Sequence, residues 1–365
     1  MYDQEKLYQV ALCNTPGLGD VLCRSIISHC GSASAYYTIP KHKLSKIPGI
    51  GPYLLPQLQN TDSLKLAEQI INTSIKKEVK ILFYTDSDYP NNLKRYEDVP
   101  ALLYCKGNMD MNSQKNIAIV GTRNATEYGK TVTHNIVKEL KPYQCTVVSG
   151  LAYGIDIAAH KACTDENMQT IGVLGSGVDV IYPAAHKNIV QKMLENGGII
   201  SELKFGTKPD SHHFPQRNRT VAAMADVTIV IESSSEGGAL ITAELANQYH
   251  KDVYAVPGNI DRKYSEGCLM LIKNHKATIF TSVADMAHQL GWDTSKEVAK
   301  PTFTGSNPDE VAIYSVLKDG ELHIDDLSWR AQIPMSKLAS LLLNMEFAGY
   351  IAILPGKKIK LVNKN

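Results

Sequence analysis

The sequence lacks several features that would assign it to common functional classes. Its seven cysteines are odd in number and none of them forms a Cys-x-x-Cys pair, so neither a disulfide framework nor a zinc site is expected. No apolar run reaches the ~18 residues that a membrane span needs. The first residues, MYDQEKLYQV, lack the basic and apolar regions of a secretory signal. We therefore expect a cytoplasmic protein with reduced thiols and no membrane-spanning segment.

The sequence also lacks a large excess of charge. Lys and Arg number 38 and Asp and Glu number 37, which gives a net charge of +1. This balance excludes a protein that coats duplex DNA through overall basicity, so any site for a polyanion must come from local clustering. What the sequence does have is 365 residues, of which 44% are hydrophobic. That is enough to bury a sizeable core in two or three domains.

Three regions separate along the chain. Residues 1–75 are predicted to form a small helical domain with two similar Pro-Gly-x-Gly turns. Residues 80–290 alternate short β-branched strands with helical segments, which predicts an α/β fold with a mostly parallel sheet covered on both faces. We expect its strands at Ile117–Val120, Thr146–Ser149, Thr170–Leu174, Gly198–Ser201, Val227–Ile231, Val253–Val256 and Ala277–Phe280.

The third region follows a polar linker at residues 291–307. Residues 308–365 are predicted to form three helices and a two-stranded tail, an order that fits a winged-helix domain. Its predicted recognition helix, Met335–Ala348, offers few side chains for reading base edges. Binding of a protein partner therefore remains open beside binding of DNA.

The most informative segment is residues 214–248. It sets Arg217, Asn218 and Arg219 before a short apolar helix, followed by a buried-looking strand and a Ser/Gly-rich loop that opens another helix. A strand, a glycine loop and a helix N-terminus form an anion site, because unpaired backbone N–H groups and the helix dipole converge there. Two nearby arginines indicate that the anion is a phosphate.

Other strands of the middle region are also followed by glycine loops. The first runs into Gly121-Thr-Arg123, and the third runs into Gly175-Ser176-Gly177, with Lys187 further on. The carboxyl ends of parallel strands meet at one edge of the sheet, so these groups predict an extended anionic ligand bound with little base readout. Asp156 and His160 lie four residues apart on a predicted helix and could form an acid/base pair, but a structural role is favoured.

Eight motifs occur in the order found in the DNA-processing protein A (DprA/Smf) family, which the middle region resembles. The resemblance implies an extended Rossmann domain that binds single-stranded DNA, dimerises, and loads the recombinase RecA during natural transformation and recombination. The motifs are Gly121-Thr-Arg, SGLAYGIDIAAHKA (149–162), IGVLGSGVDVIYP (171–183), ISELKFG (200–206), FPQRNRTVAAMAD (214–226), EGGALITAELA (236–246), VYAVPGN (253–259) and SEGCLMLIKNHKA (265–277).

The same resemblance implies which residues bind DNA and where the chain dimerises. His186 stands where the family usually has Asn, and Gly237 stands where it usually has Ser. Residues 267–277 lie where the family forms its dimer surface. Together with the glycine loops, the predicted DNA-binding residues are Gly121, Arg123, Gly175, Ser176, Lys187, Arg217, Asn218, Arg219, Gly238 and Thr242.

The N-terminal turns resemble helix-hairpin-helix or SAM-like elements, whose loop N–H groups bind a DNA phosphate. Pro52 and Pro56 interrupt the second element. We therefore slightly favour a purely structural role for this domain over a DNA-binding one.

An enzyme is the main alternative. The segment EGGALITAE loosely resembles the PGGxGTxxE loop of nucleoside-monophosphate phosphoribohydrolases, with Glu244 at the position of the catalytic glutamate. Leu240 and Ile241 replace the Gly-Thr of that loop and would obstruct a nucleotide. No GxSxG, HExxH or dinucleotide fingerprint is present, which argues against a hydrolase, a metal site and an oxidoreductase. We therefore expect a non-catalytic protein without a cofactor.

Overall fold

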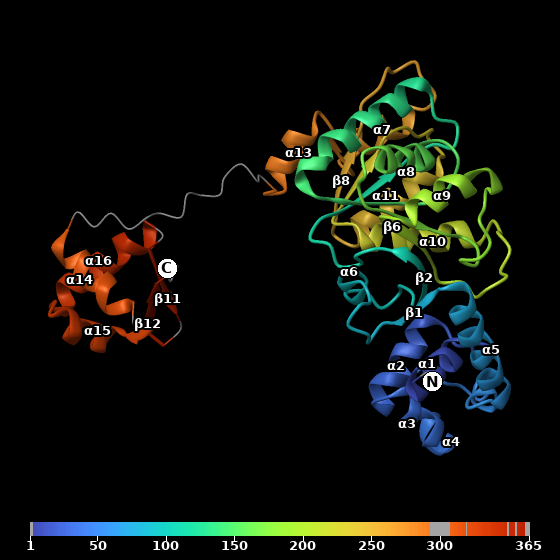
Figure 1. Ribbon diagram of the computed structural model, residues 1–365, viewed down its shortest axis with the longest axis horizontal. Coiled ribbons are helices and arrows are strands. Elements are labelled where there is room, and N and C mark those ends of the chain that lie inside the picture. Colours follow the sequence, from blue (N-terminus) through green and yellow to red (C-terminus); the bar gives the residue numbers. More distant parts are fainter. Residues whose placement is uncertain (1–2, 293–306, 319, 349, 355, 362–365) are drawn as a thin grey trace. The chain divides into compact units, whose positions relative to one another are not determined.

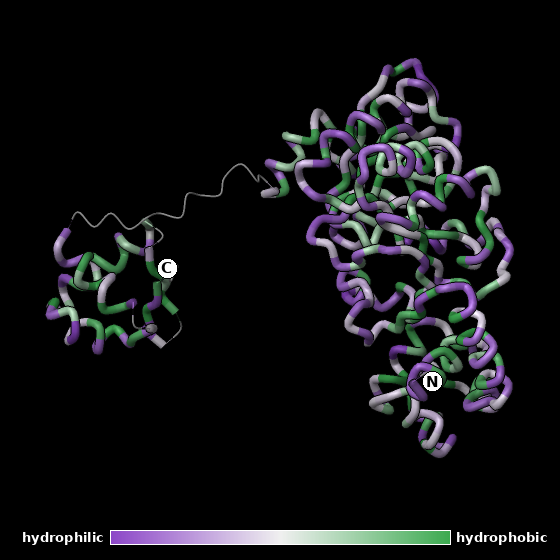
Figure 2. The backbone as a smooth tube through the Cα atoms, in the orientation of Figure 1, coloured by the Kyte–Doolittle hydropathy of each residue, from purple (hydrophilic) through white to green (hydrophobic). Residues whose placement is uncertain are grey.

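The computed structural model describes residues 3–292, 307–318, 320–348, 350–354 and 356–361. The chain divides into two compact units, Met1–Leu290 and Gly291–Asn365 (Figure 1). Hydrophobic segments run through the interior of each unit (Figure 2). Among the described helices, none is both long enough and apolar enough to cross a membrane.

The first unit is built on a sheet that has nine strands in the described part of the chain. Their order is β1-β2-β6-β5-β4-β3-β7-β8-β9. Pairing is parallel from β6 through to β9, which confirms the predicted mostly parallel α/β fold. The parallel strands are β3 (Asn116–Val120), β4 (Thr146–Ser149), β5 (Thr170–Val173), β6 (Gly197–Ser201), β7 (Val227–Val230), β8 (Asp252–Ala255) and β9 (Thr278–Ile279).

The sequence analysis missed the antiparallel edge of this sheet. Strand β1 (Lys80–Phe83) pairs antiparallel with β2 (Leu102–Asn108), and β2 pairs antiparallel with β6. An antiparallel pair needs no crossover helix between its strands, so the alternation of strand and helix that marked the parallel strands gives no signal here.

The order of the strands determines how the connecting helices pack on the sheet. From the central strand β3 the chain steps to β4, β5 and β6 on one side, and then returns to build β7, β8 and β9 on the other. Helix α8 packs against α7 and α9, and α10 packs against α11. The direction of the crossovers changes between β3 and β7, and ligands of such sheets bind at this switch point. The helices are α6 (Asn91–Lys94), α7 (Glu127–Leu140), α8 (Ile155–Asp165), α9 (Lys187–Met193), α10 (His213–Met224), α11 (Gly238–Gln248), α12 (Glu266–Lys273) and α13 (Val283–Gln289), with 3₁₀ turns at Lys141–Tyr143 and Ala184–His186.

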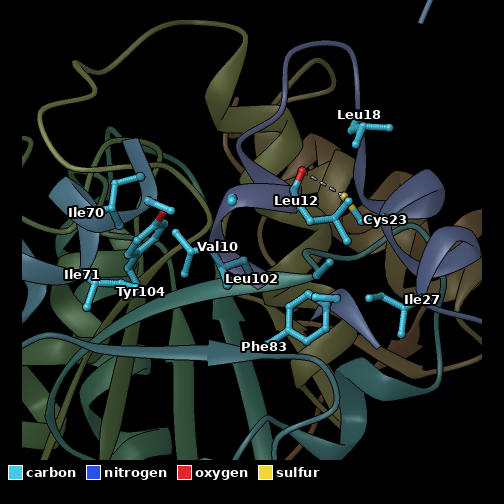
Figure 3. Packing of buried hydrophobic residues seen from close by; sticks show 14 of the residues in the cluster. Val10, Leu12, Leu18, Cys23, Ile27, Ile70, Ile71, Phe83, Leu102 and Tyr104 are labelled. Atoms are coloured by element: carbon cyan, nitrogen blue, oxygen red, sulfur yellow. Dashed lines mark hydrogen bonds between the residues drawn. The ribbon is translucent and has the colours of Figure 1, made fainter. Parts of the chain in front are cut away.

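The N-terminal helices share a core with the antiparallel edge of the sheet. In Figure 3, Val10 from the first helix and Ile70 from the fifth lie beside Tyr104 of β2, which is only 1% exposed. Burial of this ring and its neighbours couples the stability of the helical region to that of the sheet. These helices are α1 (Gln4–Cys13), α2 (Asp20–Cys30), α3 (Ala33–Thr38), α4 (Lys41–Leu44) and α5 (Thr61–Lys77), with a 3₁₀ turn at Leu55–Gln57.

The second unit has the element order of a winged helix. Its sheet has the order β10-β12-β11, and β10 is a two-residue strand that the sequence analysis did not predict. Lys337 forms an ion pair with Asp309 at 2.5 Å, and Lys358 forms one with Glu321 at 2.8 Å. The elements are α14 (Pro308–Leu317), β10 (Leu322–His323), α15 (Ile324–Ala331), α16 (Met335–Phe347), β11 (Ile351–Leu354) and β12 (Lys358–Leu361).

Candidate nucleic-acid interface

A cavity of about 710 Å³ lies outside the carboxyl ends of β3 and β7, at the switch point of the sheet. Its walls come from the loops after β3, β4 and β7, from the segment at residues 209–215, and from α10 and α11. Six of the ten predicted DNA-binding residues line it: Gly121, Arg123, Arg217, Asn218, Gly238 and Thr242.

The backbone at the start of α11 supplies one side of this cavity. The N-cap residue Gly237 has no side-chain hydrogen bond to the first turn of the helix. A Cβ on Gly238 would meet no atom within 4 Å, so the space in front of this helix end is open. Free backbone N–H groups and the positive end of the helix dipole therefore face the cavity, as an anion site requires.

Gly121 is required by packing rather than by a ligand. A Cβ at this position would lie 2.4 Å from the side chain of Ile155 and 3.0 Å from the carbonyl oxygen of Glu232. The glycine therefore allows the loop after β3 to pass close to α8 and to the end of β7, which places Arg123 at the cavity.

Arg123 is an exposed cation beside an aromatic ring. Its guanidinium carbon lies 5.2 Å from the centroid of the Phe214 ring, and the Tyr182 ring lies 6.1 Å from the same centroid. All three side chains line the cavity. A cation next to aromatic rings can bind a phosphate while an unpaired base stacks on the rings.

Arg217 supplies a buried positive charge. It is 5% exposed, and it donates from Nη1 to the carbonyl oxygen of Val173 and from Nε to Asn218 Oδ1 at 3.2 Å. Burial raises the pKa of the nearby Asp156 carboxyl to about 6, and the guanidinium of Arg217 opposes that rise. A Cβ on Gly150 would lie 2.3 Å from Asp156 Oδ2 and 2.4 Å from Arg217 Nη1, so this glycine is needed to seat both groups.

Asp156 and His160 do not form an acid/base pair. His160 is fully buried, with Nδ1 2.7 Å from Thr170 Oγ1 and Nε2 2.5 Å from the carbonyl oxygen of Gly150. Burial lowers the pKa of His160 to about 4, so the ring is neutral at pH 7. Both contacts tie α8 to the sheet, in agreement with the structural interpretation.

Four predicted residues lie outside this cavity. Gly175 lines a smaller depression that shares Arg123, Tyr182 and Phe214 with it. Ser176 is 2% exposed and its hydroxyl donates to the carbonyl oxygen of Val180, so this side chain lies in the interior of the loop. Lys187 is exposed and lines a separate cavity.

Arg219, the fourth of these residues, is held by carboxylates. Its Nη2 lies 2.6 Å from Glu202 and 3.0 Å from Asp20, and Nη1 donates to the carbonyl oxygen of Asp98. The Arg-Asn-Arg cluster was expected before the helix, but the structure places it inside α10. Residues two apart on a helix point roughly 200° away from each other, so Arg217 and Arg219 do not both line this cavity.

Sequence reasoning missed the aromatic part of the interface. Phe214 lies in the FPQRNRTVAAMAD motif and Tyr182 lies in the IGVLGSGVDVIYP motif, but neither is among the predicted DNA-binding residues. The available signal was that both aromatic residues lie in motifs that also carry predicted DNA-binding residues. The structure shows that Tyr182 is 48% exposed.

The structure separates Glu244 from the cavity. Its carboxylate is paired with Lys276 at 2.7 Å, whereas the neighbouring Ile241 lines the cavity and is 44% exposed. Glu244, which would be the catalytic glutamate if the protein were a phosphoribohydrolase, therefore points toward Lys276 and not into the cavity. Within the described residues, no cluster of three or more His, Cys, Asp or Glu side chains could hold a metal ion.

Comparison with known proteins gives matches to both units. Residues 80–291 match the family model of DNA recombination-mediator protein A, and residues 297–357 match that of the DprA winged helix domain. The chain is 32% identical over 285 residues to Protein Smf of Synechocystis sp., which covers 77% of this chain and 72% of that protein. It is 38% identical over 201 residues to DNA processing protein DprA of Streptococcus pneumoniae, covering 55% of this chain and 71% of that protein.

Two solved structures are also similar. The X-ray structure of DNA processing protein A from Streptococcus pneumoniae has a TM-score of 0.65 and 29% identity, covering 79% of this chain and 99% of that one. DNA processing protein A from Helicobacter pylori has a TM-score of 0.53 and 28% identity, covering 59% and 97%. The structure of the Helicobacter pylori protein is described as giving insight into its unique single-stranded DNA binding mode.

Proposed function

The chain belongs to the DNA recombination-mediator protein A family, and from this premise we propose that it binds single-stranded DNA without catalysing a reaction on it. One observation carries the proposal. The cavity at the switch point brings together Arg123, Arg217, the open N-terminus of α11 and the ring of Phe214.

The phosphate backbone is proposed to lie over the helix end. Gly238 leaves room for a phosphate oxygen to approach the first N–H groups of α11. Arg123 neutralises the phosphate from the mouth of the cavity, and Arg217 contributes positive charge from its floor. None of these groups reads a base edge, so binding is expected to depend little on sequence.

The aromatic side chains favour a single strand over a duplex. Phe214 and Tyr182 lie beside the cation, where a base of the bound strand can stack on them. Stacking on an aromatic face requires a base that is not already paired and stacked in a duplex. The net charge of +1 also provides little general attraction for duplex DNA.

We propose further that the bound strand is passed to RecA in the cytoplasm, during natural transformation and recombination. The resemblance of the motifs to the DNA-processing protein A family supports this step. Binding to the DNA backbone without sequence preference suits this transfer, because the recombinase must be loaded on strands of any sequence.

Direct binding measurements test the proposal. We expect an oligonucleotide of roughly 20 thymidines to bind at least about tenfold more tightly than a duplex of the same length. The logarithm of the binding constant should fall with the logarithm of salt concentration by about 0.7 for each phosphate neutralised. Equal affinity for the two DNA forms would contradict single-strand binding. For RecA loading, strand exchange is measured on DNA covered by a single-strand-binding protein, and no stimulation would leave passive binding only.

We also propose a homodimer formed through the 267–277 region. In α12 the side chain of Met270 is 36% exposed, and β9 leaves an open sheet edge at which Ile279 is 45% exposed. Apolar side chains beside an unpaired strand favour association with a second copy.

Replacing Met270 with Asp is expected to convert the dimer into a monomer, because a carboxylate would be buried without a partner at the interface. Light scattering coupled to size-exclusion chromatography measures the molar mass. Ile260→Asp is the matched control, since Ile260 is 89% exposed and lies outside the segment. A variant at Met270 that keeps the mass of the wild type would place the interface elsewhere.

A further inference from the structure

A second cavity is lined in part by the loop that follows β5. It measures about 270 Å³ and is bordered by three lysines: Lys77 at the end of α5, Lys106 in β2 and Lys187 at the start of α9. These residues come from three segments that are far apart in the sequence. No feature of the sequence brought Lys77 or Lys106 together with Lys187.

The floor of this cavity is apolar. Val178 and Val190 are each 2% exposed, and Ile199 is 1% exposed. Ile181 and Leu194 are half-buried at its side. An apolar floor with a few polar groups at its rim is the usual construction of a small-ligand site.

The charge at the rim is positive. Asp179 is the one carboxylate among the described residues that lines the cavity, and it accepts from Lys77 Nζ at 3.0 Å and from the backbone N–H of Gly206 at 2.9 Å. Among the described residues, no carboxylate forms an ion pair with Lys106 or Lys187. Two cations are therefore left to bind an anion, while Asp179 holds the loop in place.

Consecutive residues of one loop line the two cavities. Tyr182 lines the phosphate-binding cavity, whereas its neighbour Ile181 lines the lysine cavity. The loop that carries Tyr182 and Ile181 therefore borders both cavities.

We propose that the lysine cavity is a second nucleotide subsite for the same DNA strand. One base lies on the apolar floor, and the adjoining phosphates contact Lys106 and Lys187. The volume of about 270 Å³ lies just below the ~300–1,000 Å³ of sites for drug-sized ligands, which suits a single base. The proposal rests on the proposed single-stranded DNA binding, and it gives Lys187 a role outside the first cavity.

Two variants test the charge and the floor separately. Lys106→Glu reverses a rim charge, and Ile181→Trp fills the cavity without changing the charge. Both are measured in the full chain with oligothymidines of roughly 4 and roughly 20 nucleotides, because only the longer one can occupy both cavities. For the longer one we expect Lys106→Glu to weaken binding about tenfold and Ile181→Trp about fivefold. For the shorter one we expect the affinity of the wild type, which also shows that the variants are folded.

Lys192→Glu is the matched control. Lys192 is exposed on the same helix as Lys187 but five residues further on, so it faces another direction and does not line the cavity. If Lys192→Glu loses as much affinity for the longer strand as Lys106→Glu does, the loss reflects general electrostatics, and the proposed subsite is wrong. Wild-type affinity of either Lys106→Glu or Ile181→Trp for the longer strand would also overturn it, while the proposed function would stand. Failure of the wild type to bind either oligothymidine would instead overturn the proposed function.

Discussion

Replacing Arg123 with Glu is expected to lower the affinity for single-stranded DNA about 100-fold, or about 2–3 kcal/mol. In the described part of the chain, Arg123 forms no ion pair and is exposed at the mouth of the cavity. The substitution removes a cation from the phosphate and places a carboxylate beside it. Filter binding or fluorescence anisotropy with an oligothymidine measures the loss, and the salt dependence should decrease by about 0.7 for the lost phosphate contact.

Lys138→Glu provides the control for this charge reversal. Lys138 is exposed near the end of α7, a helix that begins after the carboxyl end of β3 and runs back to the other edge of the sheet. The same change in net charge should therefore alter binding by less than about threefold. Comparable losses in the two variants, or none at Arg123, would show that the strand does not follow the carboxyl edge.

Replacing Arg217 with Met is expected to lower the free energy of unfolding by about 2–4 kcal/mol. The variant leaves the carbonyl oxygen of Val173 without its Arg217 donor and leaves the buried Asp156 with only the weaker positive charge of Arg123 nearby. Urea unfolding of the full chain, with hydrogen exchange in β5, measures the loss. Arg262→Met serves as the control, since that side chain is 74% exposed and should change stability by less than about 0.5 kcal/mol.

The loss in the free energy of unfolding that Arg217→Met causes should depend on pH. The pKa of Asp156 is about 6 in the folded protein and 3.8 as its ordinary value, so the folded state binds more protons between these values. The free energy of unfolding therefore falls as the pH rises through this window. Without the guanidinium the pKa of Asp156 rises further and the window extends above pH 6. The deficit relative to the wild type should thus be larger at about pH 8 than at about pH 5. An equal deficit at both would exclude Asp156 as its source.

The parallel half of the sheet could be predicted because its strands are buried on both faces. Strands β3, β4, β5 and β7 are buried at every residue, and such strands show as continuous β-branched runs. β1, β2 and β10 do not carry this pattern over their whole length. β1 begins with an exposed residue, β2 ends in Lys-Gly-Asn, and β10 is two residues long, so their pairing depends on partners distant in the sequence.

The glycine loops of the candidate site could be predicted for a similar local reason. A loop that follows a parallel strand must lie at the carboxyl edge, which correctly placed Gly121, Arg123 and Gly238 around one cavity. The direction of a side chain within such an edge depends on the helix or loop that carries it. Ser176 and Lys187 follow the same strand as Gly175, yet one is buried and the other lines the lysine cavity.

By itself, the sequence determined the family, the α/β fold and the glycine loops around the cavity at the switch point, because strand burial and glycine loops are local properties of the chain. Only the tertiary structure decided which partners each of the two arginines of the Arg-Asn-Arg cluster contacts. Arg217 turns to the cavity, while Arg219 turns to Glu202 and Asp20. The physical reason is the rotation of roughly 200° between residues two apart on a helix, combined with carboxylates that only the folded chain brings to one side of α10.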